Sequence, residues 1–402
     1  MKSGYQRFRP IRIGLAIMTA LSVLEVGQQQ SCGQLMPGYS SPPTVIGNTA
    51  PPELAQPDWQ QNRSMSYPMQ MDWSGAVTQG YPETVSSNGW FNSQCDTCSV
   101  DGFDCQQFWE HRTRLFGDFL YLTVRDSRIP YATHVDGPVP GAAPLASTSV
   151  VDPEYQSGFR VGGAYALDPW TSISATYWAF RSEVTDSLDL PGNIGWARSE
   201  VTHPTTLSVA NDSLFARAED ETSFQIGDLA LERLICGNCV TSVNWFLGLR
   251  FVHLTQDFRS LFSISGPTTV ESEVDFDGIG PRLGIDLKRR LDGGFLVYGQ
   301  AAGGLMFGEA EAHFIQQNAT SGVQSRVGES DLRLVPQLEV ELGIGWQNHA
   351  GNVQFKAGYY FGNWFNTVTT PEWLNAIQAG DKSDVSDTLI FHGLTARAEY
   401  KF

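Results

Sequence analysis

Charged side chains recur at alternate positions of several strand-like segments in this chain of 402 residues. In the segment 330–348, Arg333, Glu339 and Glu341 alternate with leucine, valine and isoleucine side chains. Successive side chains of a β-strand point to opposite faces, so such a segment has one charged face and one apolar face. These strands predict a β-barrel with a charged interior and a lipid-facing exterior. The side chains predicted to line the interior are Arg160, Arg250, Arg282, Asp286, Lys288, Arg333, Glu339, Glu341, Lys356, Arg397, Glu399 and Lys401.

Such an interior has two alternative roles. Mixed charges could form a polar channel with weak ion selectivity. They could equally form a salt-bridged plug that closes a small barrel. Barrels of about eight strands are filled by side chains, whereas about 16–18 strands leave an aqueous channel. The segments predict ten to twelve strands, a size that leaves both roles open.

The sequence contains no catalytic constellation that we recognise. It has no Gly-x-Ser-x-Gly elbow, no phosphate-cradling glycine loop and no metal-binding histidine cluster. His253 lies close to Asp257 in the chain, which is a coincidence of spacing rather than a motif. We therefore expect no enzyme, no cofactor and no metal site, and passive diffusion through a pore would require none of them.

Five cysteines are candidates for disulfides in an exported protein. Cys95 and Cys98 form one C-x-x-C pair with Cys105 nearby, and Cys236 and Cys239 form a second pair far downstream. The long gap between the pairs is unlike the spacing of a zinc ribbon. A disulfide that joins the two groups, two local disulfides and free thiols are all compatible with the spacing.

Ten segments are expected to be strands, and the links between them are alternately short and long. Asp-Gly-Gly at 292–294 is one of the short links, where glycine accepts the positive φ of a hairpin turn. Short turns at one end and long loops at the other are typical of outer-membrane barrels. A phase shift within 222–234 predicts a bulge, and 205–216 could contain a further hairpin. The expected strands are 114–125, 157–168, 171–182, 222–234, 241–262, 273–290, 294–314, 330–348, 351–367 and 387–402.

The last segment ends on an aromatic pair, Tyr400 and Phe402, on its apolar face. A strand that ends in this way resembles the C-terminal signal by which outer-membrane barrels engage the assembly machinery. The alternative is the edge strand of a soluble sandwich, which the number and length of the other strands disfavour.

The N-terminal quarter of the chain differs in composition from the rest. Residues 1–27 have a basic start and a short apolar core, as in a signal peptide that directs export. Residues 28–110 are rich in Pro, Gly, Ser and Gln and are predicted to be disordered, with contact to the cell wall as one role. The barrel is predicted to occupy 111–402. A net charge of −17 argues against nucleic acid as a partner.

The hairpin 276–308 resembles one in the Legionella-type major outer-membrane protein family. Phe276-Asp-Gly-Ile-Gly-Pro-Arg-Leu-Gly begins the matching stretch, and Trp245-Phe-Leu-Gly-Leu-Arg-Phe251 and Glu399-Tyr-Lys-Phe402 also fit. The β-barrel porin-7 family is the second choice. The resemblance implies one β-barrel in the bacterial outer membrane, in contact with its lipid, that forms pores for small solutes or ions. The alternative is a non-conducting structural or adhesive barrel that acts through long extracellular loops.

Overall fold

The computed structural model describes residues 106–139, 141–190, 194–206, 213–263, 266–382 and 385–402. The predicted signal peptide at 1–27 lies outside these residues, as does the region from 28 to 105. The end of the region predicted to be disordered, 106–109, instead forms the short helix α2.

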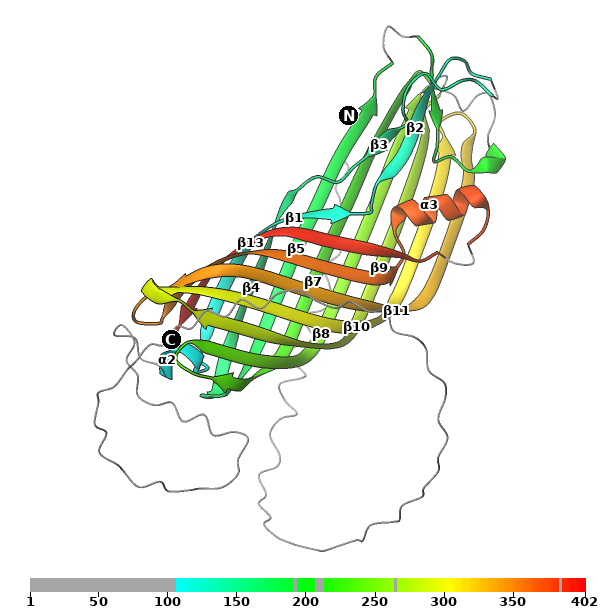
Figure 1. Cartoon of the computed structure of the whole chain (residues 1–402). Coiled ribbons are helices and arrows are strands. Elements are labelled where there is room, and N and C mark those ends of the chain that lie inside the picture. Colours follow the sequence, from blue (N-terminus) through cyan, green and yellow to red (C-terminus); the bar gives the residue numbers. More distant parts are fainter. Residues whose placement is uncertain (1–105, 140, 191–193, 207–212, 264–265, 383–384) are drawn as a thin grey trace, which may run out of the picture. The chain divides into compact units, whose positions relative to one another are not determined.

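Ten antiparallel strands close into a barrel, as the sequence predicted (Figure 1). Around the barrel the order is β1-β13-β12-β11-β10-β9-β8-β7-β5-β4, and β4 pairs with β1 to close the ring. The barrel strands are β1 (Arg114–Arg125), β4 (Gln156–Asp168), β5 (Thr171–Leu188), β7 (Phe215–Gly237), β8 (Thr241–Ser263), β9 (Thr268–Arg290), β10 (Phe295–Asn318), β11 (Gly322–Gln347), β12 (Val353–Thr367) and β13 (Asp387–Lys401).

The remaining described elements precede the first strand or lie in the links between the barrel strands. At the end with the long loops, a small sheet of order β3-β2-β6 lies near the helix α3 (Figure 1). The stretch expected to contain a further hairpin adds no strand to the barrel among its described residues. These elements are α2 (Gln106–Trp109), β2 (Ile129–Val135), β3 (Ser149–Val151), β6 (Trp196–Ser199), η3 (Pro204–Thr206), η5 (Asp292–Gly294) and α3 (Thr370–Ala379).

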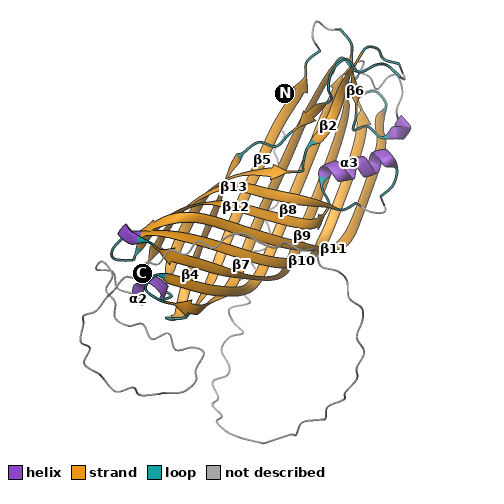
Figure 2. Ribbon diagram, in the orientation of Figure 1, coloured by secondary structure: helices purple, strands orange, loops and turns teal. Residues whose placement is uncertain are grey.

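The short links are at the end of the barrel that carries α2 and the C-terminus (Figure 2). Gly293 and Gly294 adopt φ values of 71° and 83° in the β9–β10 turn, which side chains with a Cβ rarely accept. Short turns face the periplasm in outer-membrane barrels, so we refer to this end as periplasmic and to the opposite end as extracellular.

The two faces of the long strands exchange character along their length, and β7 shows this best. At the middle of the strand the inward side chains Phe224 and Ile226 are apolar and buried. Toward the periplasmic end the inward face carries Asp228, while Leu229 and Leu231 face outward and are exposed. The pairing of β7 with β5 continues without a register shift, and its pairing with β8 shifts only between Leu234 and Cys236, near the periplasmic end of the strand. The phase change in 222–234 is therefore this exchange of faces, and the predicted mid-strand bulge is wrong.

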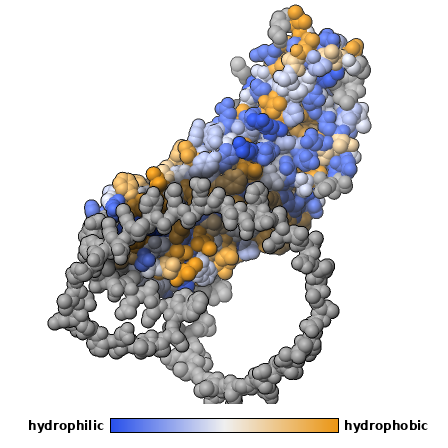
Figure 3. All heavy atoms as spheres, in the orientation of Figure 1, coloured by the Kyte–Doolittle hydropathy of each residue, from blue (hydrophilic) through white to orange (hydrophobic). Residues whose placement is uncertain are grey.

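The exterior reflects the same exchange. On the face drawn in Figure 3, apolar surface gathers over the periplasmic half of the barrel and hydrophilic surface over the extracellular half. Leu283 and Ile285 of β9 are 56% and 51% exposed in the apolar half. Exposed apolar side chains in this number indicate a surface that contacts lipid. No helix among the described residues has the length and apolar character needed to cross a membrane.

Candidate functional site

Charged side chains fill the periplasmic half of the barrel interior, and we call them the bore network. Each is at most 20% exposed. Eight are cationic, namely Arg114, Arg160, Arg250, Arg282, Lys288, Lys356, Arg397 and Lys401, and seven are carboxylates, namely Asp118, Asp228, Glu232, Asp286, Glu339, Glu341 and Glu399.

One cluster of the bore network surrounds Arg250 on β8. Its guanidinium donates to both carboxylate oxygens of Asp228 at 2.6 and 2.8 Å and reaches Glu339 on the opposite wall. Glu339 also accepts from Arg282 at 2.8 Å and from the hydroxyl of Tyr360 at 3.0 Å. Buried charges are costly unless they are paired and hydrogen-bonded, and this cluster meets both conditions.

A second cluster surrounds Asp118 on β1. Arg397 donates to its two oxygens at 2.7 and 2.9 Å, and Arg160 donates to it from β4. Arg160 also donates to Glu341 on β11 at 2.9 Å, which joins opposite walls of the barrel. Its guanidinium lies 4.2 Å from the ring centre of Trp178. Multidentate pairs of this kind hold arginine in a fixed orientation.

The ion pairs of Glu399, at the periplasmic end of the bore network, are longer than those in the two clusters above. Glu399 faces two ammonium groups, Lys356 at 3.8 Å and Lys401 at 3.7 Å, and neither distance is that of a hydrogen bond. Lys288 lies 3.0 Å from Asp286 on its own strand. One oxygen of Glu399 is buried and accepts no hydrogen bond from a described residue.

Glycines in the wall explain where the cations lie. The side chain of Tyr298 lies so close to two glycines that a Cβ built on Gly343 would be 2.7 Å from its ring, and one built on Gly358 would be 2.3 Å from its hydroxyl oxygen. Phe246 lies in the same way against Gly284. A cation covers each ring on the lumen side: Lys356 is 5.2 Å from the ring centre of Tyr298, and Arg282 is 4.8 Å from that of Phe246. The rings therefore lie against the wall, and the cations that cover them lie on the lumen side.

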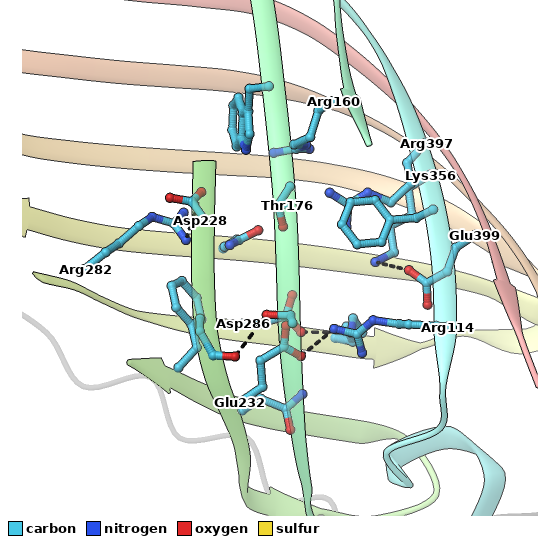
Figure 4. A pocket seen from close by; sticks show the side chains of 18 residues that line it. Arg114, Arg160, Thr176, Asp228, Glu232, Arg282, Asp286, Lys356, Arg397 and Glu399 are labelled. Carbon is cyan, nitrogen blue, oxygen red and sulfur yellow. Dashed lines mark hydrogen bonds and ion pairs between the residues drawn. The ribbon is translucent and has the colours of Figure 1, made fainter. Parts of the chain in front are cut away.

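A polar cavity remains between these side chains, with about 70 Å³ of free space. Figure 4 shows Lys356 and Glu399 on one side of it and Asp228 and Arg282 on the other. This space holds a few water molecules or one small ion, and it is too small for a continuous aqueous channel.

Above the bore network, an apolar layer fills the extracellular half of the interior. Phe224 and Phe391 contact edge to face with ring centres 4.9 Å apart, and Trp364 lies 5.4 Å from Phe391. All three are at most 2% exposed. Trp373 of α3 belongs to the same buried cluster, so the helix contributes to this layer from the long-loop end. The lumen is closed at this level.

A short segment covers the periplasmic mouth. His111 hydrogen-bonds Ser172 of β5 at 2.8 Å and Asn244 of β8 at 3.1 Å, so its ring joins the two strands that flank β7. Trp109 of α2 stacks on Trp170 with ring centres 4.7 Å apart. Sequence reasoning did not single out this segment, because nothing in its composition marks a cap.

The structure brings together eleven of the twelve side chains expected inside the barrel. Arg333 points inward but lies away from the network, where it donates to the carbonyl oxygen of Val385 at 2.6 Å. Four members of the bore network were missed: Arg114, Asp118, Asp228 and Glu232. They occupy the two strands, β1 and β7, whose faces exchange character, so simple alternation did not assign them to one face.

The cysteines at the periplasmic end differ from each other. Cys239 is disulfide-bonded, whereas Cys236 is a free and exposed thiol. The two do not pair with each other, so a local disulfide at this turn is wrong. Cys95, Cys98 and Cys105 lie outside the described residues.

His253 pairs with a carboxylate of the neighbouring strand and has the hydroxyl of Thr255 3.4 Å from its other ring nitrogen. His253 lies 2.7 Å from Asp277 on the neighbouring strand, not beside Asp257, and both partners of this pair face outward. In the part of the chain that the structure describes, no three His, Cys, Asp or Glu side chains are placed to hold a metal ion.

The C-terminal strand β13 pairs with β1 and β12 and closes the barrel. The rings of Tyr400 and Phe402 lie edge to face, 5.0 Å apart, and are 46% and 65% exposed. The amide of Phe402 donates to the carbonyl oxygen of Thr113 at 2.9 Å. Two aromatic side chains therefore face outward at the periplasmic edge of the apolar belt, as in an interfacial girdle.

Comparisons with known proteins agree with this architecture. The profile of the family described as Legionella pneumophila major outer membrane protein precursor matches residues 114–402, which comprise all ten barrel strands. A search of curated proteins finds no match.

Several solved outer-membrane proteins are similar at low identity. The outer membrane protease OmpT from Escherichia coli is 10% identical, over 73% of this chain and 97% of that one, with a TM-score of 0.40. The toluene transporter TodX from P. putida is 9% identical over 74% and 91%, with a TM-score of 0.32. The monoaromatic hydrocarbon channel CymD is 11% identical over 74% and 90%, with a TM-score of 0.26. TM-scores this low transfer no activity to this chain.

Proposed function

The chain belongs to the Legionella major outer membrane protein family, an outer-membrane barrel family, and from this premise we propose a barrel that is closed to solutes at rest. The observation that carries the proposal is that two layers of side chains fill the lumen. The bore network occupies the periplasmic half, and the apolar layer of Phe224, Trp364 and Phe391 occupies the extracellular half. A closed barrel of this kind acts through its rigidity and its exposed loops rather than by conduction.

The bore network supports this role because it joins opposite walls. Arg250 on β8 and Arg160 on β4 both pair with carboxylates of β11, which neighbours neither strand. Displacing either arginine to open a path would leave buried carboxylates without a partner, at a cost of several kcal/mol. Opening therefore requires a concerted rearrangement rather than the movement of one side chain.

A pore for small solutes or ions, as the family resemblance implies, is the second candidate. The observation that favours it is the polar cavity beneath the apolar layer, whose walls already carry both signs of charge. Conduction would then require the apolar layer and α3 to move, which would make the protein a gated pore rather than an open one.

Single-channel recording distinguishes the two candidates. The full chain is refolded, its folded state is verified by gel heat-modifiability, and it is inserted into a planar bilayer. We expect a folded barrel without conductance steps. Stable, reproducible steps from the unaltered chain would overturn the closed-barrel proposal and support the pore.

A matched pair of variants locates the seal. The triple variant Phe224→Ala, Trp364→Ala, Phe391→Ala removes the apolar layer and should produce small conductance steps. The control Phe307→Ala, Phe355→Ala, Phe361→Ala removes three outward rings and should stay silent. If both triple variants are folded and silent, the bore network alone closes the lumen.

We also propose that the protein has no catalytic activity and that its C-terminal strand engages the barrel-assembly machinery. His253, its partner Asp277 and the hydroxyl of Thr255, which lies 3.4 Å from Nε2 of His253, all face outward from the barrel wall, and this placement supports the first statement. The exposed aromatic pair at the end of β13 supports the second.

A further inference from the structure

The bore network has one cation more than it has carboxylates, and the excess lies at its periplasmic level. Arg250, Arg160 and Arg397 each have a carboxylate at hydrogen-bond distance. Lys356 and Lys401 instead share Glu399, at 3.8 and 3.7 Å. An uncompensated charge in a water-poor interior is costly, so the arrangement calls for a further negative charge at this level.

Lys356 is one of the two lysines that line the cavity, the other being Lys288. Figure 4 shows Lys356 among the side chains that line the cavity. Its ammonium nitrogen lies over the ring of Tyr298, which separates it from the wall. Its one ion pair among the described residues is the long contact with Glu399, although an ammonium group has three hydrogens to donate. The unused donors therefore point toward the free space of the cavity.

Six cationic side chains and four carboxylates line the cavity, so its lining carries a net positive charge. Arg114, Lys288 and Arg397 line it together with Lys356, and Lys288 lies directly opposite Tyr298 on the adjacent strand. Converging donors around a space of about 70 Å³ suit an acceptor of a few atoms and exclude an organic acid of ordinary size.

We propose that this cavity binds one small inorganic anion, of halide or phosphate size, against Lys356. The anion supplies the missing negative charge and accepts the hydrogen bonds that Glu399 is too distant to accept. Water could fill the space but would not balance the charge. The site lies at the periplasmic end, so the anion enters from beneath the segment that His111 holds over the mouth.

Bromide is the probe that tests the site directly. Crystals of the full chain grown with sodium bromide should show an anomalous peak in contact with Nζ of Lys356. Titration calorimetry of the folded full chain in detergent, with sodium bromide and then with sodium phosphate, should give saturable binding of one anion. If only phosphate or only bromide saturates the site, the result supports the proposal and identifies the size of anion that the site prefers.

Three variants assign the binding to this site. Lys356→Met keeps the length of the side chain but removes its charge, and it should weaken the binding of the anion at least about tenfold. Glu399→Gln removes the competing carboxylate and should strengthen the binding of the anion several-fold. A variant that had lost its structure would not bind the anion more tightly. Lys382→Met changes an exposed lysine between α3 and β13 and should leave binding unchanged.

Two results would overturn the proposal. The first is the absence of both the bromide peak and the saturable binding in the unaltered chain. Such a result would mean that a lysine at this level is neutral, so that no excess positive charge needs an anion. The second is unchanged affinity in the Glu399→Gln variant. This variant remains informative even if Lys356→Met does not fold.

Discussion

Arg250 and Glu339 form an ion pair across the barrel interior, although their strands are not neighbours in the sheet. Arg250 is on β8 and Glu339 on β11, with β9 and β10 between them in the ring. Both side chains are almost fully buried, at 1% and 6% exposure. The pair therefore joins two walls that backbone hydrogen bonds do not connect directly.

Removing one partner of this pair should be severely destabilising. Glu339→Ala leaves Arg250 and Arg282 with less compensating charge in a buried site, and we expect a loss of about 3–5 kcal/mol in the free energy of unfolding. Guanidinium unfolding of the barrel in lipid vesicles, followed by tryptophan fluorescence, measures it. The matched control is Glu329→Ala, an exposed carboxylate on the same strand, which should change the free energy of unfolding by less than about 1 kcal/mol. Equal losses in the two variants would mean that the pair does not connect the walls energetically.

The sequence predicted the barrel because alternation is a local property. The last strand shows this: Leu394 and Tyr400 face outward and Arg397 faces inward, as their period of two requires. The short turns were predictable for the same reason, since the positive φ of Gly293 is a property of the local backbone. Such features do not depend on what lies on the opposite wall.

The filled interior could not be predicted because it depends on contacts between distant strands. Nothing near Arg160 in the chain indicates that Glu341 lies 2.9 Å away. The apolar layer was hidden too, since a buried Phe224 and a lipid-facing Leu229 are equally apolar in the sequence. Only the closed ring shows that one points into the lumen and the other out.

The outward face can be tested at Leu338. This side chain is 47% exposed and lies midway along the apolar outer face of β11. Leu338→Arg should cost about 2–4 kcal/mol, because a charge at the bilayer midplane must leave water. The free energy of unfolding in vesicles measures the loss, and Leu338→Met should be nearly neutral. A neutral Leu338→Arg variant would place this position outside the hydrocarbon region.

The inward neighbour Gln337 should not tolerate arginine either, contrary to the expectation from alternation alone that a polar interior would accept it. Gln337 is 5% exposed and accepts a hydrogen bond from Arg250 at 3.1 Å. Arginine there would place a second cation against Arg250 and crowd the interior. We expect Gln337→Arg to reduce the yield of folded barrel, as read from gel heat-modifiability, while Gln337→Met should fold. Normal folding of the arginine variant would show that this level of the bore holds more water than its packing indicates.

The aromatic pair at the end of β13 should matter for assembly rather than for stability. Tyr400 and Phe402 contact each other and face outward, so replacing both with alanine removes few contacts inside the barrel. We expect the double variant to accumulate less heat-modifiable barrel in the outer membrane while refolding normally in vitro. Phe355→Ala is the control, since it removes an exposed ring from the adjacent strand. Equal amounts of membrane-inserted barrel in all three proteins would refute an assembly signal.

Asp220 makes stability depend on pH in the extracellular part of the barrel, above the apolar belt. Its inward side chain is 2% exposed and faces the apolar interior beside Val184 and Phe258 in the register. One carboxylate oxygen accepts no hydrogen bond from a described residue. Burial, together with the negative charges of Asp257 and Glu221, raises the pKa of Asp220 from 3.8 to about 7.

A raised carboxyl pKa changes the stability of the folded state with pH in a definite direction. Between about pH 4 and pH 7 the folded state keeps the proton of Asp220 while the unfolded state has lost it, so this group lowers stability as pH rises through that window and leaves it low above pH 7. Asp220→Asn cannot ionise and has nearly the same shape. We therefore expect it to match the unaltered chain near pH 4 and to exceed it at pH 8 by a few kcal/mol in the free energy of unfolding. Guanidinium unfolding at both pH values tests this, with the exposed Glu154→Gln as control. A gain of the same size at both pH values would show that the amide acts by packing, and that Asp220 is not the titrating group.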